Sequence, residues 1–327
     1  MMNSSDAVAR LLIACTLAMF AGCAVAQQTY PSKPIRLISP FTPGGANSLM
    51  ARLVGQKLTE SWGQQVIVEN IPGAGTVIGT DAVVRAAPDG YTLLLSGGNL
   101  MLTPLLFPAP YDPLKDLAPV ASFARSENML VINPSVPANN LKELIAYAKS
   151  RPGQLNYASP GAGTTQHLAH ELLNMAAEIQ TQHIPYKGQS LALTDVLGGR
   201  VQLYFLTPTY ATPLINSGKV KAMAISGETR AQGLLQVPTF AEAGLPSLTD
   251  AGTWFGVIAP AATPRAIIDK LSTEIGKFVA MPDFREALIT QGSNPNFANA
   301  DQLAARLKAD LARFTRIIKS ANIKMDN

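Results

Sequence analysis

An uncharged proline-glycine loop joins a strand-like stretch to a helix-like stretch three times in this chain. The first loop, 40–48, reads Pro-Phe-Thr-Pro-Gly-Gly-Ala-Asn-Ser, and the other two share the pentapeptide Pro-Gly-Ala-Gly-Thr at 72–76 and 160–164. Glycine permits a sharp turn and a close approach of a ligand to the backbone. Because a helix start presents unpaired N–H groups and a partial positive charge, such a loop can hold an anion without lysine or arginine.

Short apolar runs alternate with helical periods along most of the chain, which predicts parallel strands joined by crossover helices. We expect strands at 35–39, 66–69, 92–96, 129–132, 156–158, 201–205, 222–225 and 255–259. We expect helices at 48–58, 77–87, 141–150, 165–176 and 190–197, and then consecutive helices at 264–279, 282–291 and 300–320. The expected fold class is α/β, with mainly parallel sheets flanked by helices.

Two extended runs that end in proline, 129–134 and 254–260, are suited to carry the chain between two lobes. An inserted second lobe would then span 134–253. The first lobe would combine 27–133 with 254–327. The apolar content of 47% is sufficient for one large core or two moderate ones.

The N-terminal segment 1–26 has the pattern of a secretion signal. Arg10 precedes an apolar run at 11–21, and an Ala-Val-Ala cleavage pattern ends at Ala26. The mature chain is therefore expected to begin near Gln27. No later stretch reaches 18 apolar residues, so no membrane-spanning helix is expected after the signal.

Both cysteines of the chain, Cys15 and Cys23, lie in this predicted signal. The mature chain would therefore have no disulfide, no thiolate nucleophile and no cysteine-bound metal. A lipoprotein attached through Cys23 is the alternative, against which Phe20 argues because phenylalanine is a poor residue three positions before a lipidated cysteine.

The net charge of +4 does not indicate a nucleic-acid-binding protein. Lysine and arginine are scattered singly, and aromatic residues are only 6% of the chain, so no basic stripe with interleaved aromatics is present. Mild basicity indicates instead a general attraction to acidic solutes.

Neither a cofactor nor a metal is expected. The Gly-Ala-Gly-Thr-Val-Ile-Gly stretch at 73–79 has one residue too many for a dinucleotide fingerprint, and the next strand ends in Ser-Gly-Gly where that fingerprint needs an acidic residue. His167, His170 and Glu171 do not form the H-E-x-x-H zinc pattern, and His183 lies on a separate strand. A capping or packing role is expected for His167.

Nucleophilic catalysis is not indicated, because the chain has no G-x-S-x-G elbow and its predicted mature part has no cysteine. Acid/base pairs that form only in the folded structure remain an open alternative.

Reversible binding is the function that the loops favour. Loops 43–48 and 160–165 belong to different predicted lobes, and ligands of open α/β sheets bind beyond the carboxyl ends of strands. The alternative is that these glycines serve turn geometry alone.

Ordered motifs along the chain match one known family. They begin at Tyr30 (Tyr-Pro-Ser-Lys-Pro-Ile-Arg-Leu-Ile), Val68 (Val-Glu-Asn-Ile-Pro-Gly-Ala-Gly), Pro88 (Pro-Asp-Gly-Tyr-Thr-Leu-Leu), Glu143 (Glu-Leu-Ile-Ala-Tyr-Ala-Lys), Tyr157 (Tyr-Ala-Ser-Pro-Gly-Ala-Gly-Thr), His183 (His-Ile-Pro-Tyr-Lys-Gly), Pro238 (Pro-Thr-Phe-Ala-Glu-Ala-Gly) and Trp254 (Trp-Phe-Gly). From about residue 29 to its C-terminus, the chain resembles the Bug family, the periplasmic solute-binding receptors of tripartite tricarboxylate transporters.

The resemblance implies a two-lobed periplasmic binding protein, type II-like, that binds its ligand in the cleft between the lobes. It implies a monomer in the periplasm that is not an enzyme. The implied partners are a small carboxylate (a dicarboxylic, monocarboxylic or aromatic acid) and two membrane subunits of a transporter. A sensor subunit of a signalling system, and an enzyme that uses the same cleft, are the open alternatives.

The resemblance also implies which loops hold the ligand. Backbone N–H groups and water would hold one carboxylate at the first and third loops, and two further loops, 96–99 and 206–210, would meet the rest of the ligand. The middle loop 72–76 is expected to be a structural turn near the cleft rim. The implied site residues are Phe41, Thr42, Gly44, Gly45, Ala46, Asn47, Ser48, Ser96, Gly97, Ser159, Gly161, Gly163, Thr164, Thr165, His167, Leu206 and Thr207.

Two positions depart from the family pattern. Ser48 and Leu206 stand where the family often has aspartate. Both departures would make the cleft less acidic and remove a partner for a cation. The hypothesis that follows is a ligand without an ammonium group.

Overall fold

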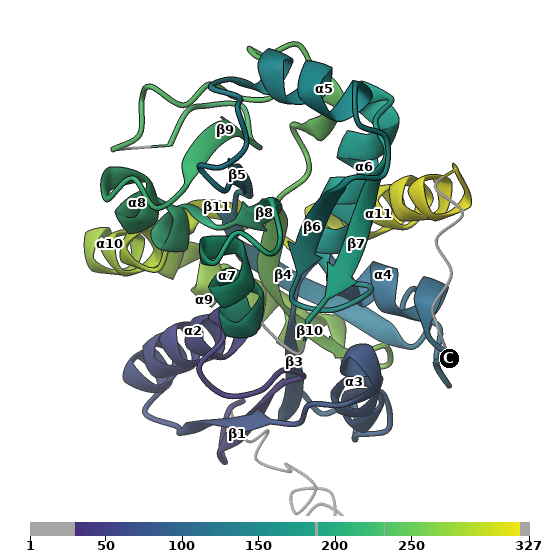
Figure 1. Cartoon of the computed structure of the whole chain (residues 1–327). Coiled ribbons are helices and arrows are strands. Elements are labelled where there is room, and N and C mark those ends of the chain that lie inside the picture. The colour runs from purple at the N-terminus through teal and green to yellow at the C-terminus, as the bar shows by residue number, and fades with distance from the viewer. Residues whose placement is uncertain (1–29, 187–188, 232, 321–327) are drawn as a thin grey trace, which may run out of the picture.

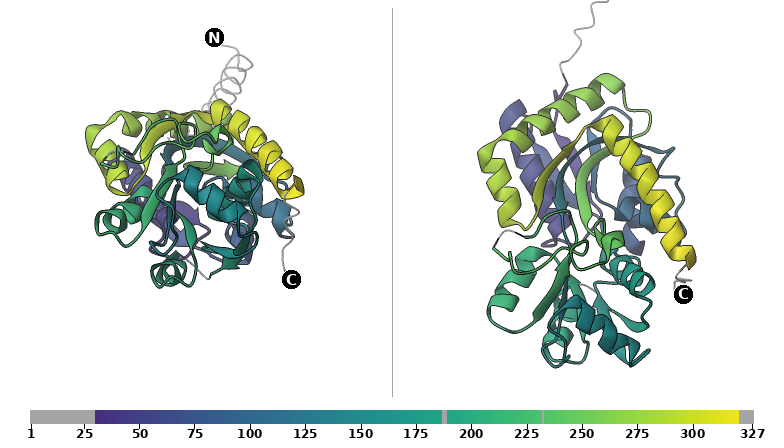
Figure 2. Two further views of the ribbon diagram at one scale, coloured as in Figure 1. Left: turned by 45° about the horizontal axis from the view of Figure 1, so that its top comes forward. Right: turned by 90° about the horizontal axis from the view of Figure 1, so that it is seen from above.

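The computed structural model describes residues 30–186, 189–231 and 233–320, which form two lobes, each built on one β-sheet (Figure 1). The right-hand view of Figure 2 separates the lobes, with the purple, blue and yellow elements and the light-green strand Thr253–Pro260 in one, and the teal and remaining green elements in the other. The predicted signal, its cleavage site and both cysteines lie outside the described residues. Within the described residues, no helix combines the length and the apolar character needed to cross a bilayer.

The sheet of the first lobe has six strands in the order β11-β4-β10-β3-β1-β2. The strands are β1 (Ile35–Ser39), β2 (Val66–Asn70), β3 (Thr92–Ser96), β4 (Leu117–Ser126), β10 (Thr253–Pro260) and β11 (Asn294–Ala298). β1 runs parallel to β2 and β3, whereas β10 is antiparallel to β3 and β4, and β11 is antiparallel to β4.

The sheet of the second lobe has five strands in the order β7-β6-β8-β5-β9. The strands are β5 (Met129–Ile132), β6 (Leu155–Ser159), β7 (Thr181–Pro185), β8 (Leu203–Leu206) and β9 (Lys221–Ile225). β6 is parallel to β7 and β8, and β5 is antiparallel to β8 and β9. Both sheets are therefore mixed, which corrects the prediction of mainly parallel sheets while the α/β class itself is confirmed.

The mixed topology follows from the two crossings between the lobes. The chain leaves the first lobe at the end of β4 and returns at the start of β10, so these strands meet the boundary at Ser126 and Thr253, which pair with each other. In the second lobe Met129 begins β5 and pairs with Ile225 at the end of β9. The sequence-based boundary at 133/134 placed β5 in the first lobe, whereas this strand is hydrogen-bonded between β8 and β9.

Helices cover both faces of each sheet. In the first lobe they are α2 (Ala46–Trp62), α3 (Val77–Val84), α4 (Asn99–Leu106), α9 (Arg265–Ala280), α10 (Pro282–Thr290) and α11 (Ala300–Ser320). In the second lobe they are α5 (Leu141–Lys149), α6 (Thr165–Ala177), α7 (Gln189–Leu197) and α8 (Pro208–Asn216). Short 3₁₀ turns occur at Ala74–Thr76 and Pro246–Leu248.

The cores reflect the alternation of side chains along each strand. In β3, Leu93 and Leu95 join the core beneath α2 and α9, whereas Leu94 joins the core beneath α4 and α11. This second core also contains Leu168 of α6, beside Phe314 of α11. The C-terminal helix therefore packs on its own sheet and also touches the second lobe.

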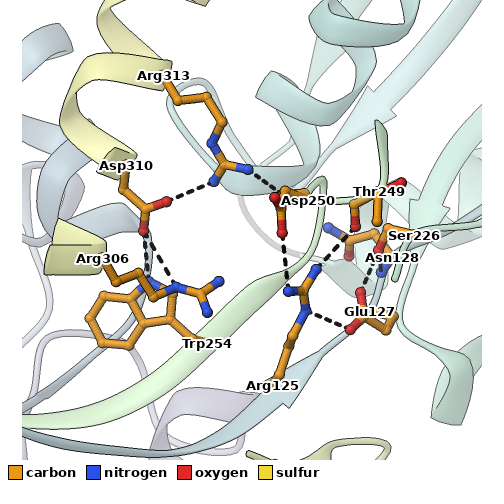
Figure 3. A network of polar contacts seen from close by, with 10 residues as sticks. All are labelled: Arg125, Glu127, Asn128, Ser226, Thr249, Asp250, Trp254, Arg306, Asp310 and Arg313. Atoms are coloured by element: carbon orange, nitrogen blue, oxygen red, sulfur yellow. Dashed lines mark hydrogen bonds and ion pairs between the residues drawn. The ribbon is translucent and has the colours of Figure 1, made fainter. Parts of the chain in front are cut away.

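A polar network joins the two crossing segments (Figure 3). Arg125 Nε lies 2.6 Å from Glu127 Oε1, and Arg125 Nη1 lies 3.1 Å from Asp250 Oδ1. Ser226 Oγ donates to Glu127 Oε2 at 2.8 Å, and Asn128 Nδ2 donates to Ala251 O at 2.7 Å. The outgoing segment, around residues 126–128, is thus bonded to the returning segment, around 249–252.

The same network continues to α11 (Figure 3). Trp254 Nε1 donates to Asp310 Oδ2 at 2.9 Å, and Arg313 Nη2 donates to Asp310 Oδ1 at 3.0 Å. Arg313 Nη1 also reaches the backbone oxygen of Asp250 at 2.5 Å. Asp310 is only 5% exposed, so its carboxylate depends on these partners for the solvation that water would otherwise supply.

Replacing Asp310 with alanine removes the acceptor of the buried Trp254 N–H and the carboxylate partner of Arg313. An unpaired buried donor or charge costs roughly 2–4 kcal/mol, so the free energy of unfolding is expected to fall by about that amount in urea titrations followed by circular dichroism. Asp301→Ala is the matched control, because Asp301 lies on the same helix and pairs with the exposed Arg265, an interaction worth about 0–1 kcal/mol. Equal losses in the two variants would contradict the role of Asp310.

Candidate ligand-binding cleft

A cavity of about 450 Å³ lies between the two lobes and is lined by residues of both. Its lining includes Phe41 and Thr42 from the first lobe and Thr164 and Thr207 from the second. Among the described residues that line it, none is Asp, Glu, Lys, Arg or His. A volume of this size suits a small organic molecule, and any charge on such a molecule would have to be met by dipoles.

The starts of six helices supply those dipoles. α2, α3, α4, α6, α7 and α8 each follow a strand, and the first residues of each helix, or the turn before it, line the cavity. The carboxyl ends of β1, β2, β3, β6, β7 and β8 therefore point toward one space. Because each helix start carries a partial positive charge, the cavity favours an anion without any basic side chain among the described residues that line it.

Most of these helix starts have no side-chain cap. α2, α3, α4 and α8 begin without one, whereas α5, which starts away from the cavity, is capped by Asn140 Oδ1 accepting from the Glu143 N–H at 2.9 Å. α9 and α10 also lack side-chain caps, so an uncapped start alone does not mark the site. The uncapped starts of α2, α3, α4 and α8 differ from those of α9 and α10 because they converge on one cavity.

The first loop is held in place from beneath. Asn70 Nδ2, at the end of β2, donates to Phe41 O at 2.9 Å, and Ser48 Oγ donates to Asn70 Oδ1 at 3.3 Å. Ser39 Oγ donates to Asn47 Oδ1 at 2.9 Å, which leaves the amide NH₂ of Asn47 as its donor group on the cavity side. The predicted residues of this loop that line the cavity are Phe41, Thr42, Gly45, Ala46 and Asn47. Gly44 and Ser48 do not line it.

The third loop is shaped by residues behind it. Thr164 Oγ1 donates to Gly161 O at 2.8 Å, and the Gly163 N–H donates to His167 Nδ1 at 3.2 Å. Ser159 Oγ lies 2.6 Å from His183 Nε2 and also accepts from the Gly161 N–H at 3.2 Å. Of the predicted residues in this region, Gly163, Thr164 and Thr165 line the cavity, whereas Ser159, Gly161 and His167 lie outside the lining and support the loop.

All three histidines of the chain stack behind the third loop. The rings of His167 and His183 lie 3.9 Å apart between centroids, and those of Tyr157 and His170 lie 4.0 Å apart. Burial lowers the pKa of His167 to about 3 and that of His183 to about 4. Burial and the neighbouring imidazoles lower the pKa of His170 well below its usual value. The rings are therefore neutral at neutral pH, and a neutral His167 is required to accept the Gly163 N–H.

The stack packs behind the third loop, and His167 accepts the Gly163 N–H. Among the described residues, no three His, Cys, Asp or Glu side chains are grouped in a way that would hold a metal ion. The sequence offered no signal that the three rings would meet, because they come from α6 and β7 and are joined through Tyr157 of β6.

The middle loop also lines the cavity, and this corrects the expectation of a structural turn near the rim. Gly73, Gly75 and Thr76 all belong to the lining. The loop is bonded to α4: Thr103 Oγ1 donates to Gly75 O at 2.8 Å, and Asn99 Nδ2 donates to Thr76 Oγ1 at 3.4 Å. All three proline-glycine loops therefore face the same space.

The two remaining predicted loops each contribute in part. Gly97 and Thr207 line the cavity, whereas Ser96 and Leu206 are fully buried at the ends of β3 and β8 and do not. The side chains at Ser48 and Leu206, where aspartate was expected from the family pattern, are thus both outside the lining. The absence of acidic groups from the described lining therefore depends on all of its residues and not on these two positions.

Several lining residues were missed by the sequence analysis. Thr103 and Phe107 follow Asn99 at intervals of four residues. Residues with this spacing lie on one face of a helix, so the sequence would have indicated this lining if a helix had been predicted there. Gln189 comes from the start of α7, and Phe255 from β10. Gln189 carries no motif and Phe255 belongs to the Trp-Phe-Gly motif that begins at Trp254, but only the fold shows that both reach the cavity.

Comparisons with known proteins agree with this architecture. The family model described as "Tripartite tricarboxylate transporter family receptor" matches residues 50–323. The chain is 37% identical to Protein BugT of Bordetella pertussis over 304 residues, which is 92% of this chain and 93% of that protein. It is also 37% identical over 313 residues to a protein from the tcbD-tcbE intergenic region of Pseudomonas sp. strain P51, covering 94% of this chain and 93% of that protein.

Solved structures share the fold. One described as a periplasmic transporter is 39% identical, with a TM-score of 0.81, and covers 91% of this chain and all of that one. An R. palustris protein with adipate is 31% identical, with a TM-score of 0.81, over 90% of this chain and 99% of that one. MatC from Rhodopseudomonas palustris with bound malate is 29% identical, with a TM-score of 0.75, over 88% of this chain and 100% of that one. These likenesses confirm the two-lobed periplasmic binding protein fold.

The buried imidazoles predict how stability depends on pH. Because the folded-state pKa values of His167 and His183 are depressed below the ordinary value, the unfolded chain binds protons first as the pH falls. The free energy of unfolding is therefore expected to be level above about pH 6.5 and to fall between about pH 6.5 and 4.

The His167→Gln/His183→Gln variant provides the comparison, since a glutamine side chain can accept the Gly163 N–H but does not titrate. Urea titrations at several pH values above about 5, where carboxylates with ordinary pKa values stay largely ionised, should give a shallower fall for this variant than for the wild type. Identical slopes would show that these imidazoles do not control the acid side of the stability profile.

Proposed function

The chain belongs to the tripartite tricarboxylate transporter receptor family, and from this premise we propose that it captures a small carboxylate in the cavity between its lobes and presents it to a transporter. The observation that carries the proposal is the convergence of six helix starts on a cavity that has no charged side chain among its described lining residues. The adipate and malate bound by two structural relatives support a carboxylate as the ligand.

Backbone donors at the first and third loops would hold one carboxylate group. In α2 the N–H groups of Ala46, Asn47 and Ser48 belong to the first turn, where no intrahelical acceptor is available. In α6 the corresponding donors are those of Thr165 and Gln166, because Thr164 Oγ1 already accepts the N–H of His167 at 3.4 Å. These donors come from different lobes, so a carboxylate between them would bind both lobes at once.

Ligand binding would favour the closed arrangement of the lobes. A ligand shifts a conformational equilibrium only through contacts that differ between the two states. Donors from α2 and α6 reach one carboxylate only when the lobes are close, and the bonded crossing segments around 126–128 and 249–252 are where such a motion would bend. Closure is therefore driven by the ligand itself.

The uncharged lining bears on the class of ligand. An ammonium group buried in this cavity would meet helix starts of the same sign and no carboxylate from the described lining residues. The proposed ligand is accordingly an acid without an amino group.

We further propose that the chain is exported to the periplasm, is cleaved near Ala26, and acts as a monomer with two membrane subunits.

A binding panel tests this function. The protein, unfolded and refolded to release any retained ligand, is titrated with mono-, di- and tricarboxylates in a thermal-shift assay followed by calorimetry. A bound acid at about 100 times its dissociation constant should stabilise the fold by roughly 2.7 kcal/mol. Within matched pairs, succinate should bind at least tenfold more tightly than aspartate, and glutarate more tightly than glutamate. A preference for the amino acids would contradict the assigned ligand class, and no response to any acid would contradict the proposed function.

Gly45→Leu tests the site within the same panel. Gly45 has an ordinary negative φ of −79°, and a Cβ there would come no nearer than 3.8 Å to a neighbour, so the fold should tolerate the change. The side chain would stand at the start of α2 and is expected to weaken acid binding at least a hundredfold. Gly198→Leu, at the end of α7 and outside the cavity lining, is the control and should bind as the wild type does. Unchanged affinity in Gly45→Leu would place the site elsewhere.

A further inference from the structure

The repeated pentapeptide brings two equivalent glycines against one aromatic ring. Gly75 and Gly163 are each the fourth residue of Pro-Gly-Ala-Gly-Thr, one in each lobe, and both have left-handed φ values, 61° and 75°. A Cβ on Gly75 would lie 2.6 Å from Phe107 Cε2, and a Cβ on Gly163 would lie 3.0 Å from the same carbon. The ring of Phe107 therefore occupies the space between the two pentapeptides.

Both contacts require glycine. Real side chains almost never approach other atoms as closely as 2.6 Å, so alanine at position 75 would displace the ring. Residues with a Cβ also rarely adopt these φ values. The two loops thus approach Phe107 at a distance that only a bare backbone permits, and the ring is enclosed from two sides.

The ring is held by the first lobe and only touched by the second. Phe107 follows α4, and its N–H donates to Thr103 O at 2.8 Å. Asn99, Thr103 and Phe107 are spaced by four residues, and the first two bind the middle loop through the hydrogen bonds described above. In contrast, the neighbours found around Gly163 in the first lobe are the apolar side chains of Leu106 and Phe107. The ring thus has a stable position relative to the middle loop, whichever way the second lobe moves.

We propose that Phe107 determines which acids the cavity accepts: its ring forms a fixed wall between the two lobes and limits the length of the bound molecule. The ring lines the cavity together with both glycine-rich loops that flank it. A carboxylate held at the starts of α2 and α6 directs the rest of the molecule into the remaining space, and Phe107 is one boundary of that space. This inference rests on the proposed function, because it concerns the same site.

A purely structural role for Phe107 makes a different prediction. If the ring served only to pack the lobes together, its loss would weaken the binding of all acids by a similar factor. If the ring limits length, its loss must change the order of preference. The rank order across a series of chain lengths therefore separates the two roles, whereas a single affinity does not.

The experiment is calorimetry with straight-chain monocarboxylates and α,ω-dicarboxylates of four to eight carbons, applied to the wild type, Phe107→Ala and Phe107→Leu. In Phe107→Ala the preferred length should increase by one or two methylene groups, and the affinity ratio of the longest to the shortest acid should rise at least tenfold. Phe107→Leu should fall between the other two. Phe297→Ala, which removes an exposed phenylalanine of β11 outside the cavity lining, is the control and should keep the wild-type order.

The outcomes distinguish this inference from the function on which it rests. If the wild type binds acids and Phe107→Ala binds them in the same order, with equal or uniformly lower affinity, the inference is overturned and the proposed function stands. If the wild type binds none of these straight-chain acids, the inference is overturned, and the full panel of mono-, di- and tricarboxylates decides the proposed function. Melting temperatures of the unliganded variants are measured alongside, so that a misfolded variant is recognised and Phe107→Leu then decides the result.

Discussion

The mutual repulsion of six helix starts is the interaction on which the rest of this structure depends. Each start is the positive end of a helix dipole, and all six face one cavity in which the part of the chain that the structure describes places no acidic side chain to compensate them. Bringing such ends together is unfavourable until an anion lies between them. In the proposed function, the empty closed state would be destabilised relative to the liganded one, and this difference would let the receptor close upon its ligand. A permanent basic residue would bind acids more strongly but would also hold them longer.

Polar contacts hold the three loops and the crossing segments in position against that repulsion. Asn70 holds the first loop, α4 holds the middle loop, and the neutral histidines support the third loop through Gly163. The crossing segments are bonded to each other through Glu127 and Asn128 and to α11 through Arg313. The shape of the loops is therefore set by neighbouring residues, some of which, such as Asn99 and Thr103, also line the cavity.

The sequence predicted the elements that repeat a pattern and missed those that depend on topology. The apolar strands β1, β3 and β5 were predicted with the bounds that the structure has, and α6 and α11 within one residue, because burial imposes a clear period on them. β4 and β11 were missed, since Pro119 and Pro295 interrupt their sequences and both strands are antiparallel members of a sheet that was expected to be parallel. The lobe assignment of β5 failed for a related reason: a strand that follows a crossing looks the same in sequence as one that precedes it.

In the cavity, too, the sequence predicted the residues that belong to a pattern and missed those that only the fold brings together. The glycine-rich loops were found because glycine at a strand-to-helix turn has a physical meaning, yet the role of the middle loop was misjudged because its partner, Phe107, carries no motif. Residues such as Ser159 and His167 were expected in the site and instead support it, since sequence proximity to a loop does not say which way a side chain points.

The central claim is that backbone N–H groups at helix starts bind the carboxylate, and amide chemical shifts test it most directly. The ¹⁵N-labelled protein would be titrated with adipate or malate and followed by ¹H–¹⁵N correlation spectra. The account predicts that the largest downfield amide proton shifts occur at Ala46, Asn47 and Ser48 of α2 and at Thr165 and Gln166 of α6. Large shifts confined to arginine side chains, or to amides outside the helix starts that face the cavity, would contradict it.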